Sequence, residues 1–309
     1  MFTYGSIRPC DTGDLMNAAA QTFNIRGRSL WLDVWETLKK NRAAFAATLV
    51  LAAMAVSVMV APMLSPYAFD ATDFNQISLG PSLPTMHLFG TDALGRDVFV
   101  RTMYGGRISL MVGLVATAVS LIIGVAWGAI AGFIGGRTDH VMMRIVDVLY
   151  AMPFMFFVIL LMVFFGRSIV LIFVAIGAIN WLDMARIVRG QTLSLKAEQF
   201  VEAARAGGVS NFNIVRRHIV PNLLGVVAVY VTLTIPQVIL VESFLSFLGL
   251  GVQEPMTSWG ALVNEGAQEM ETAPWLLIFP AVFLAATLFC LNFIGDGLRD
   301  ALDPRDRSK

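Results

Sequence analysis

Residues 198–222, EQFVEAARAGGVSNFNIVRRHIVPN, form a polar, charged stretch between segments that are almost wholly apolar. We expect a first helix over 196–206, because Ala, Glu, Gln and Arg are good helix formers. It should stop at Gly207 and Gly208, since a residue without Cβ readily takes the left-handed conformation that ends many helices. Ser210 can cap a second helix, and Pro221 should end it. The stretch therefore predicts a helix–Gly-Gly–helix pair held close to a membrane surface.

The composition is that of a membrane protein. Of the 309 residues, 57% are hydrophobic and 14% are charged, and the mean hydropathy is +0.70. Soluble domains carry about 25% charged residues. The formal net charge is zero, so there is no basic excess to neutralise the phosphates of nucleic acid. The two cysteines, Cys10 and Cys290, are far apart and the three histidines lack ligand spacing, so we expect neither a disulfide framework nor a metal site.

Six apolar segments are long enough to cross a bilayer, which takes about 20 residues in a helix. They cover 43–64, 108–134, 141–165, 169–187, 223–248 and 275–294. Pro153 should kink the third of them. The predicted fold class is all-α: a polytopic membrane protein of six transmembrane helices, with the helix–Gly-Gly–helix pair as a cytoplasmic coupling loop.

The distribution of positive charge predicts the orientation. Six spans place both termini on the same side of the membrane. With the termini and residues 188–222 inside, Arg96, Arg101, Arg107 and Arg167 lie outside, and the other 18 of the 22 lysines and arginines lie inside. Positive residues concentrate on the cytoplasmic side, so we expect both termini and the polar stretch to be cytoplasmic.

The chain is then expected to divide into four parts. Residues 1–43 are a cytoplasmic N-terminal segment with an interfacial helix from Leu30. Residues 44–107 hold the first transmembrane helix and an outer, periplasmic loop. Residues 108–295 are a five-helix core that includes the loop 188–222, and residues 296–309 are a cytoplasmic tail.

Glycines spaced by four mark one face of the second predicted span. Gly124, Gly128 and Gly132 place three residues without side chains in a row on one side of a helix. Small residues at this spacing let another helix approach closely in a membrane. We therefore expect this face to pack against a neighbouring span.

Three carboxylates fall inside the predicted spans, where ionisable groups are costly and often functional. Asp147 and Asp183 are expected near cytoplasmic ends, where Arg144 and Arg186 can pair with them. Glu242 is expected near the outer end of the fifth span. It either lines the pathway or contacts a second subunit, or it snorkels to the outer interface.

The polar stretch has a family resemblance. Glu202-Ala203-Ala204, followed by Gly208 and Pro221, resembles the EAA loop of ABC-importer permeases, and the ending H-I-x-P-N resembles the peptide-permease branch. The family's I-x-L-P ending is replaced here by His218-Ile219-Val220-Pro221. The resemblance implies a set of residues that couple the chain to an ATPase: Glu202, Ala203, Ala204, Gly208, His218 and Pro221. Within this set Glu202 would anchor, the alanines would permit close approach, and Gly208 would make the bend.

A second, longer stretch resembles the same family. Residues 89–110, FGTDALGRDVFVRTMYGGRISL, are similar to peptide and nickel permeases. We expect the Arg and Asp residues of this stretch to order the outer loop rather than to contact substrate. From Arg28 onward the chain resembles the C-type permease subunit of bacterial oligopeptide importers.

This resemblance implies a subunit in the cell inner membrane that forms half of a pathway for oligopeptides. The implied partners are a second permease subunit, two cytoplasmic ATPase subunits, a periplasmic peptide-binding protein and membrane lipid. ATP and magnesium would be bound by the ATPase subunits, so this chain would hold no cofactor.

Sequence motifs of enzymes are absent. The chain has no G-x-x-x-x-G-K-[ST], no H-E-x-x-H and no G-x-S-x-G, so we expect it to catalyse no reaction itself. Dipeptides or nickel are alternative substrates. The alternative from a different class is an ion-coupled secondary transporter, which predicts an inverted repeat and broken helices around midplane carboxylates. The sequence indicates neither feature. A purely structural membrane scaffold is a further alternative, which the long polar loop argues against.

Overall fold

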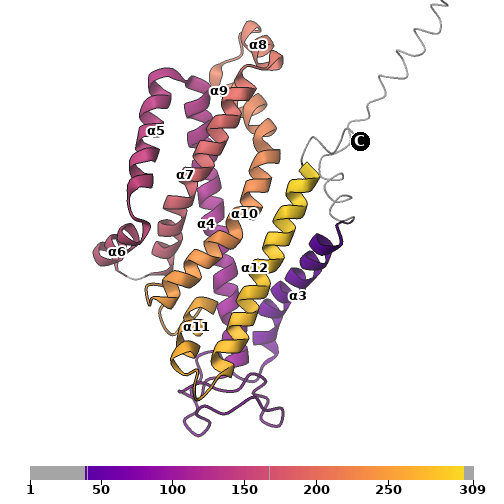
Figure 1. Ribbon diagram of the computed structural model, residues 1–309, viewed down its shortest axis with the longest axis vertical. Helices are drawn as coiled ribbons and strands as arrows, with labels where there is room; N and C mark the ends of the chain where they lie inside the picture. The colour runs from indigo at the N-terminus through magenta and orange to yellow at the C-terminus, as the bar shows by residue number, and fades with distance from the viewer. Residues whose placement is uncertain (1–38, 40, 167, 303–309) are drawn as a thin grey trace, which may run out of the picture.

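The computed structural model describes residues 39, 41–166 and 168–302, and these are helical apart from loops and two isolated β-bridges. The helices are α3 (Arg42–Leu64), α4 (Val98–Ile134), α5 (Gly136–Ala151), α6 (Phe154–Phe165), α7 (Ile169–Lys196), α8 (Gln199–Ala206), α9 (Asn211–Ile214), η1 (Val215–Ile219), α10 (Val220–Phe247), α11 (Trp259–Gln268) and α12 (Trp275–Leu302). The prediction of an all-α fold is confirmed. The long helices lie side by side, with α8 and α9 at one end of the molecule and α11 at the other (Figure 1). The interfacial helix expected from Leu30 lies outside the described residues.

Among the described helices, four are long and apolar enough to cross a membrane. They are α3, α4, the continuous helix Asn211–Phe247 that contains α9, η1 and α10, and α12. The number rises to five if the bent pair of α5 and α6 counts as one span. Because α7 is not among them, six spans remain a prediction.

The third predicted span is a broken pair of helices rather than one kinked helix. α5 and α6 meet at an angle of 88°. Met152 between them is extended, with φ −76° and ψ 132°, which is the conformation favoured before a proline. Pro153 also lacks the N–H that would continue the helix. The prediction that Pro153 only kinks the span is therefore wrong.

The second span begins earlier than expected, at Val98 rather than at residue 108. Asp97 caps α4 by accepting a hydrogen bond of 2.8 Å from the N–H of Val100. The first turns of α4 carry Arg101 and Arg107, whose charge suggested a loop. The predicted end of the outer loop at residue 107 is therefore wrong, and the loop ends at Asp97.

The fourth predicted span is longer than expected, because α7 runs on to Lys196. It takes over the start of the helix expected over 196–206, and α8 begins only at Gln199. Asp183 consequently lies near the middle of α7 rather than near its end. Ser210 occupies the N-cap position of α9, but its side chain makes no capping hydrogen bond.

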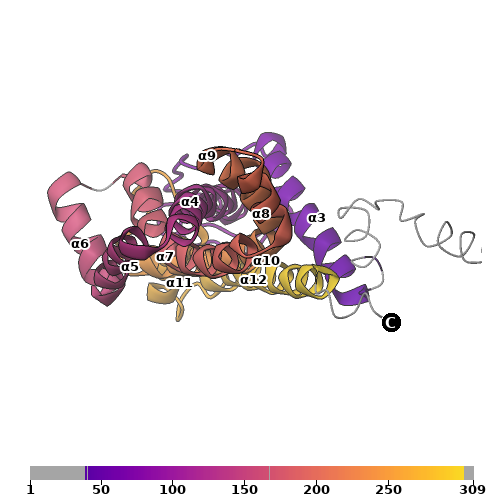
Figure 2. The ribbon, with the colours of Figure 1, turned by 90° about the horizontal axis from the view of Figure 1, so that it is seen from above.

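The close approach predicted for the glycine face of α4 is confirmed, and the partner is α7. A Cβ at Gly124 would lie 2.5 Å from the Met184 Cβ, and one at Gly132 would lie 2.9 Å from the Arg189 carbonyl oxygen. A Cβ at Gly128, between them, would meet the α7 backbone. Contacts advance in the same direction along both helices, so α4 and α7 are parallel neighbours (Figure 2).

Candidate functional site

The turn of the loop 188–222, the predicted coupling loop, is a glycine cap at the end of α8. Gly208 has a φ of +75°, whereas Gly207 keeps a φ of −75°. The N–H of Val209 donates to the Ala204 carbonyl at 3.1 Å, and the N–H of Gly208 donates to the Arg205 carbonyl at 3.0 Å. These are the two hydrogen bonds of a Schellman motif. Of the two glycines, only Gly208 requires the left-handed conformation.

The second helix of the loop does not end at Pro221, contrary to prediction. It continues through η1 into α10 as one helix over Asn211–Phe247. η1 is a π-helical turn in which the N–H of Val220 donates to the Val215 carbonyl, five residues back. In a regular α-helix the ring of Pro221 would clash with the carbonyl of Arg217. The wider turn precedes the proline, which then lies in the first turn of α10.

The loop packs against the end of α4. Val201 of α8, Ile214 of α9 and Ile219 of η1 are fully buried in one cluster with Phe133 of α4. The Arg205 guanidinium lies 5.1 Å from the centre of the Phe133 ring, within the range of a cation–π contact. α8 and α9 thus lie across the end of the helix bundle, as Figure 2 shows from above. A force on the loop would be transmitted directly to α4.

The outer face of the loop is open. Of the expected coupling residues, Glu202, Ala203, Gly208 and Pro221 are exposed, and Ala204 and His218 are half-buried. The Glu202 carboxylate has no hydrogen-bond or ion-pair partner among the described residues. The His218 ring lies 6.4 Å from that of Phe200. The structure thus brings these residues onto one short loop.

An apolar groove adjoins α9. It has a volume of about 460 Å³ and lies between the end of α4 and the α9–η1 turn. Phe133, Ile134, Phe212 and Val215 line it, and the side chain of Phe212 is 72% exposed. Together with the exposed α8, this groove gives the loop a surface that an apolar side chain of another protein could fill.

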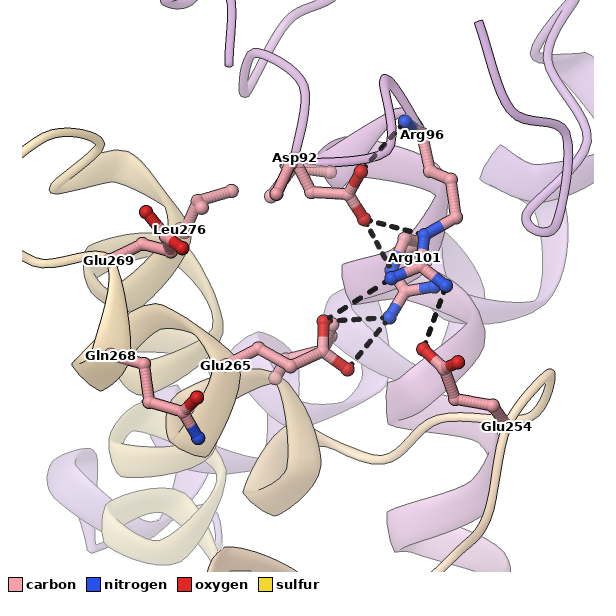
Figure 3. Close-up of a pocket in the computed structure, with 11 residues that line it drawn as sticks. Asp92, Arg96, Arg101, Glu254, Glu265, Gln268, Glu269 and Leu276 are labelled. Atoms are coloured by element: carbon pink, nitrogen blue, oxygen red, sulfur yellow. Dashed lines mark hydrogen bonds and ion pairs between the residues drawn. The ribbon is translucent and has the colours of Figure 1, made fainter. Parts of the chain in front are cut away.

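A network of charged side chains lies at the opposite end of the molecule (Figure 3). Arg96 pairs with Asp92 at 2.6 Å and with Glu254 at 2.9 Å. Arg101, which is 1% exposed, donates through Nη2 to both carboxylate oxygens of Glu265, at 2.9 and 2.8 Å. The network ties the loop before α4 to α4 itself, to the segment before α11 and to α11. The Asp and Arg pairs expected to order the outer loop are present.

The electrostatics of this network follow from burial and pairing. Burial raises the pKa of Glu265, and Arg101 and Arg96 oppose that rise. Burial alone would lower the pKa of Arg96, but its hydrogen bonds to Glu254 and Asp92 leave that pKa above its usual range. A cavity of about 180 Å³ adjoins the network. Sequence reasoning missed Glu254 and Glu265, which lie 158 and 164 residues from their arginine partners.

Glu242 lies inside the folded chain and not at its surface. The side chain is fully buried within the chain, and its carboxylate accepts hydrogen bonds from Ser109 at 3.2 Å and Ser246 at 2.7 Å. Ser258 bonds to Ser246 and caps α11. Hydroxyl groups of α4 and α10 therefore satisfy the carboxylate internally, and Ser258 joins them through Ser246. The snorkelling alternative is wrong, and no part of this side chain is free to contact a second subunit. Glu242 instead holds α4, α10 and the start of α11 together.

Of the other two carboxylates, Asp147 is paired as expected but with a different arginine, and the expected pair of Asp183 is absent from the described residues. Arg186 pairs with Asp147 of α5 at 2.9 Å, not with Asp183. The two partners are 39 residues apart, so the helical spacing of Asp183 and Arg186 was misleading. Arg144 has no ion-pair partner among the described residues.

Comparison with known families bears on both ends of the molecule. Residues 124–308 match the family described as binding-protein-dependent transport system inner membrane component. The chain belongs to this family. Residues 29–81 match the N-terminal TM domain of oligopeptide transport permease C.

Several relatives in this family align with the chain over nearly its whole length. The oligopeptide transport system permease protein OppC of Escherichia coli K12 is 59% identical over 93% of this chain and 95% of its own length. The protein of the same name from Haemophilus influenzae is 57% identical over 93% of this chain and 92% of its own length. The dipeptide transport system permease protein DppC of Bacillus subtilis is 46% identical over 89% and 86%.

The fold of this inner membrane component is similar to that of a solved transporter. The inward-facing MetNI methionine ABC transporter aligns with a TM-score of 0.56 over 72% of this chain and 99% of its own chain, at 18% identity. The relatives of the present chain are transport permeases and not enzymes. The broken pair α5–α6 is a feature that the ion-coupled alternative would predict, but family membership decides against that alternative.

Proposed function

We propose that this chain is one of two permease subunits in an ATP-driven importer of oligopeptides, located in the cell inner membrane. The observation that supports this proposal most strongly is the 57–59% identity to two oligopeptide permease proteins over 93% of the chain. The partners are a second permease subunit, two cytoplasmic ATPase subunits that bind ATP and magnesium, and a periplasmic peptide-binding protein. The spans contact membrane lipid, and this chain binds no nucleotide.

The chain crosses the membrane six times, with both termini and the coupling loop in the cytoplasm. The parallel packing of α4 and α7 supports this topology. If both helices cross in the same direction, the chain must return between them. Only α5 and α6 lie between them in sequence, so the bent pair together makes that return crossing.

The coupling loop 188–222 docks the chain on an ATPase subunit. Its exposed Glu202 and Ala203 supply the contact, as an amphipathic helix does in a groove of a partner. Ala204 and His218 are half-buried beside these residues. Gly208 sets the angle between α8 and the long helix that contains Pro221. Closure of the ATPase subunits on ATP moves the loop and, through the Phe133 cluster, moves α4 and α10 as packed bodies.

The loop can be tested by two adjacent, matched substitutions in the purified complex, reconstituted in vesicles. Gly208→Ala places a Cβ at a φ of +75°, whereas Gly207→Ala places one at −75° with only ordinary contacts. The strain is about 1 kcal/mol or more. We expect Gly208→Ala to lower peptide uptake per ATP hydrolysed about fivefold, with the complex still assembled, and Gly207→Ala to match the unmodified complex.

Several results would contradict parts of the proposal. Equal coupling in Gly208→Ala and the unmodified complex would count against the docking role of the loop. Peptide uptake that continues without ATP, or a complex that purifies with neither an ATPase nor a second permease, would overturn the importer itself. Transport of dipeptides but not of longer peptides would move the substrate to that of the dipeptide relative.

A further inference from the structure

We propose that the cavity between the α5–α6 break and the middle of α7 receives an ammonium group of the transported peptide, and that Asp183 pairs with it. The inference rests on the proposed function and adds a recognition residue to it. The cavity has a volume of about 290 Å³. Its lining comes from three segments: Leu149, Tyr150 and Met152 at the end of α5, Phe157 of α6, and Ala178, Ile179, Leu182 and Asp183 of α7.

Asp183 is the single charged side chain that lines this cavity. Apart from Asp183 and Tyr150, every residue of the lining is apolar. An ionised carboxylate facing apolar walls within a membrane segment is costly unless it is paired. The cavity therefore places one carboxylate beside room for a group that would pair with it.

The nearest cations are already engaged. Arg186, three residues along α7, pairs with Asp147 and lies 4.4 Å over the ring of Tyr150. Arg189 binds Asp139 through two hydrogen bonds, at 2.5 and 2.6 Å. Within the part of the chain that the structure describes, Asp183 has no hydrogen-bond or ion-pair partner. No described cation is thus paired with Asp183, and the proposal supplies one from the transported peptide.

The size and chemistry of the cavity select the ligand. Small-molecule sites start at about 300 Å³, so this cavity holds one terminal residue or one long side chain, not a whole oligopeptide. The aliphatic and aromatic walls suit the carbon atoms of such a group, and Asp183 accepts hydrogen bonds from its ammonium. In a peptide this ammonium is either the α-amino group or the side chain of a lysine.

The position of Asp183 is consistent with a site that binds the peptide transiently during transport. Asp183 lies near the midpoint of α7, which spans Ile169–Lys196. Opposite α7, the cavity is bounded by the end of α5 and the start of α6, which the break at Pro153 separates. In the proposal, α5 and α6 therefore move separately against α7. One ion pair, without a surrounding cage of further donors, binds the group weakly enough to release it.

The test uses the complete importer in vesicles, with ATP inside and two labelled peptides, Ala-Ala-Ala and Ala-Lys-Ala. Asp183→Asn keeps the shape of the side chain and removes its charge, and Asp183→Glu restores the charge. Asp296→Asn is the matched control, because it makes the same change at an exposed carboxylate of α12. Copurification of the partner subunits is measured for every variant.

We expect Asp183→Asn to slow uptake about tenfold in an assembled complex, Asp183→Glu to recover most of it, and Asp296→Asn to leave it unchanged. Equal slowing for both peptides identifies the α-amino group, and slowing of Ala-Lys-Ala alone identifies the lysine side chain.

Unchanged uptake of both peptides by Asp183→Asn would overturn the inference. Loss of the second permease from Asp183→Asn, but not from Asp183→Glu, would also overturn it, because Asp183 would then pair with that subunit. An unmodified complex that imports neither peptide would overturn the proposed function first.

Discussion

Arg101 shows how much of the outer end depends on one side chain. Its guanidinium is fully buried and binds Glu265 with two hydrogen bonds, and its Nε and Nη1 find no acceptor among the described residues. Arg101→Met would leave Glu265 without its closest cation and the largely buried Asp92 with Arg96 alone. Breaking a fully buried ion pair costs about 3 kcal/mol or more, but the Glu265 side chain is 37% exposed, so solvent screening lowers the cost here to about 2 kcal/mol. We expect the midpoint of thermal unfolding of the purified complex to fall by roughly 4 °C or more.

The control for Arg101 is a second carboxylate of the same network. Glu254 pairs with Arg96, but its side chain is 64% exposed. Exposed ion pairs contribute about 0–1 kcal/mol, so Glu254→Gln should lower the midpoint by about 2 °C at most. If Arg101→Met and Glu254→Gln gave the same small change, the buried network would not hold the outer end together.

At the scale of elements, α4 and α7 are in close contact along the three glycines of α4. A Cβ at Gly128 would overlap the backbone of α7 at Ala185, and overpacking of this kind costs about 1–3 kcal/mol. Gly190 of α7 has no atom within 4 Å of the corresponding position. We expect Gly128→Ala to lower the unfolding midpoint of the complex by several degrees. Gly190→Ala should leave it unchanged or raise it slightly, because Ala is the better helix former at this open position. Equal stability of the two variants would show that α4 and α7 can separate at no cost.

The sequence predicted those elements whose signal is local. The glycine spacing on α4 and the cap at Gly208 each need only neighbours in the chain, and both are found in the structure. Proline was ambiguous, because its effect depends on the turn before it. Pro153 follows an extended residue and breaks the helix, whereas Pro221 follows a π-turn and stays inside one.

Long-range pairs could not be predicted from spacing. Arg186 has Asp183 within one turn of its own helix but binds Asp147, because α5 packs against α7 and brings that carboxylate to it. Glu242 likewise accepts a hydrogen bond from Ser109 of α4, 133 residues away, in addition to the bond from Ser246 on its own helix. The family resemblance gave the coupling residues by motif, but it gave no partner for any carboxylate.

At the scale of the whole molecule, the number of crossings decides which side each loop faces. If α5 and α6 together cross once, residue 71 lies outside, and residues 210 and 300 lie inside. If the pair does not cross, α7 runs in the opposite direction and residue 210 lies outside. Single cysteines at Ala71, Ser210 and Asp300, which are all exposed, can separate these topologies. The background is Cys10→Ser with Cys290→Ser.

We expect a membrane-impermeant maleimide added to intact cells to label the cysteine of Ala71→Cys alone. Those of Ser210→Cys and Asp300→Cys should react only after the membrane is permeabilised. The physical reason is the parallel contact of α4 and α7, which requires a return crossing between them. The excess of positive residues on the side of the coupling loop then predicts that this side is cytoplasmic. Labelling of Ser210→Cys in intact cells would mean that α5 and α6 enter and leave on the same side. The loop could not then reach a cytoplasmic ATPase, and the coupling role of Glu202 and Gly208 would be lost with it.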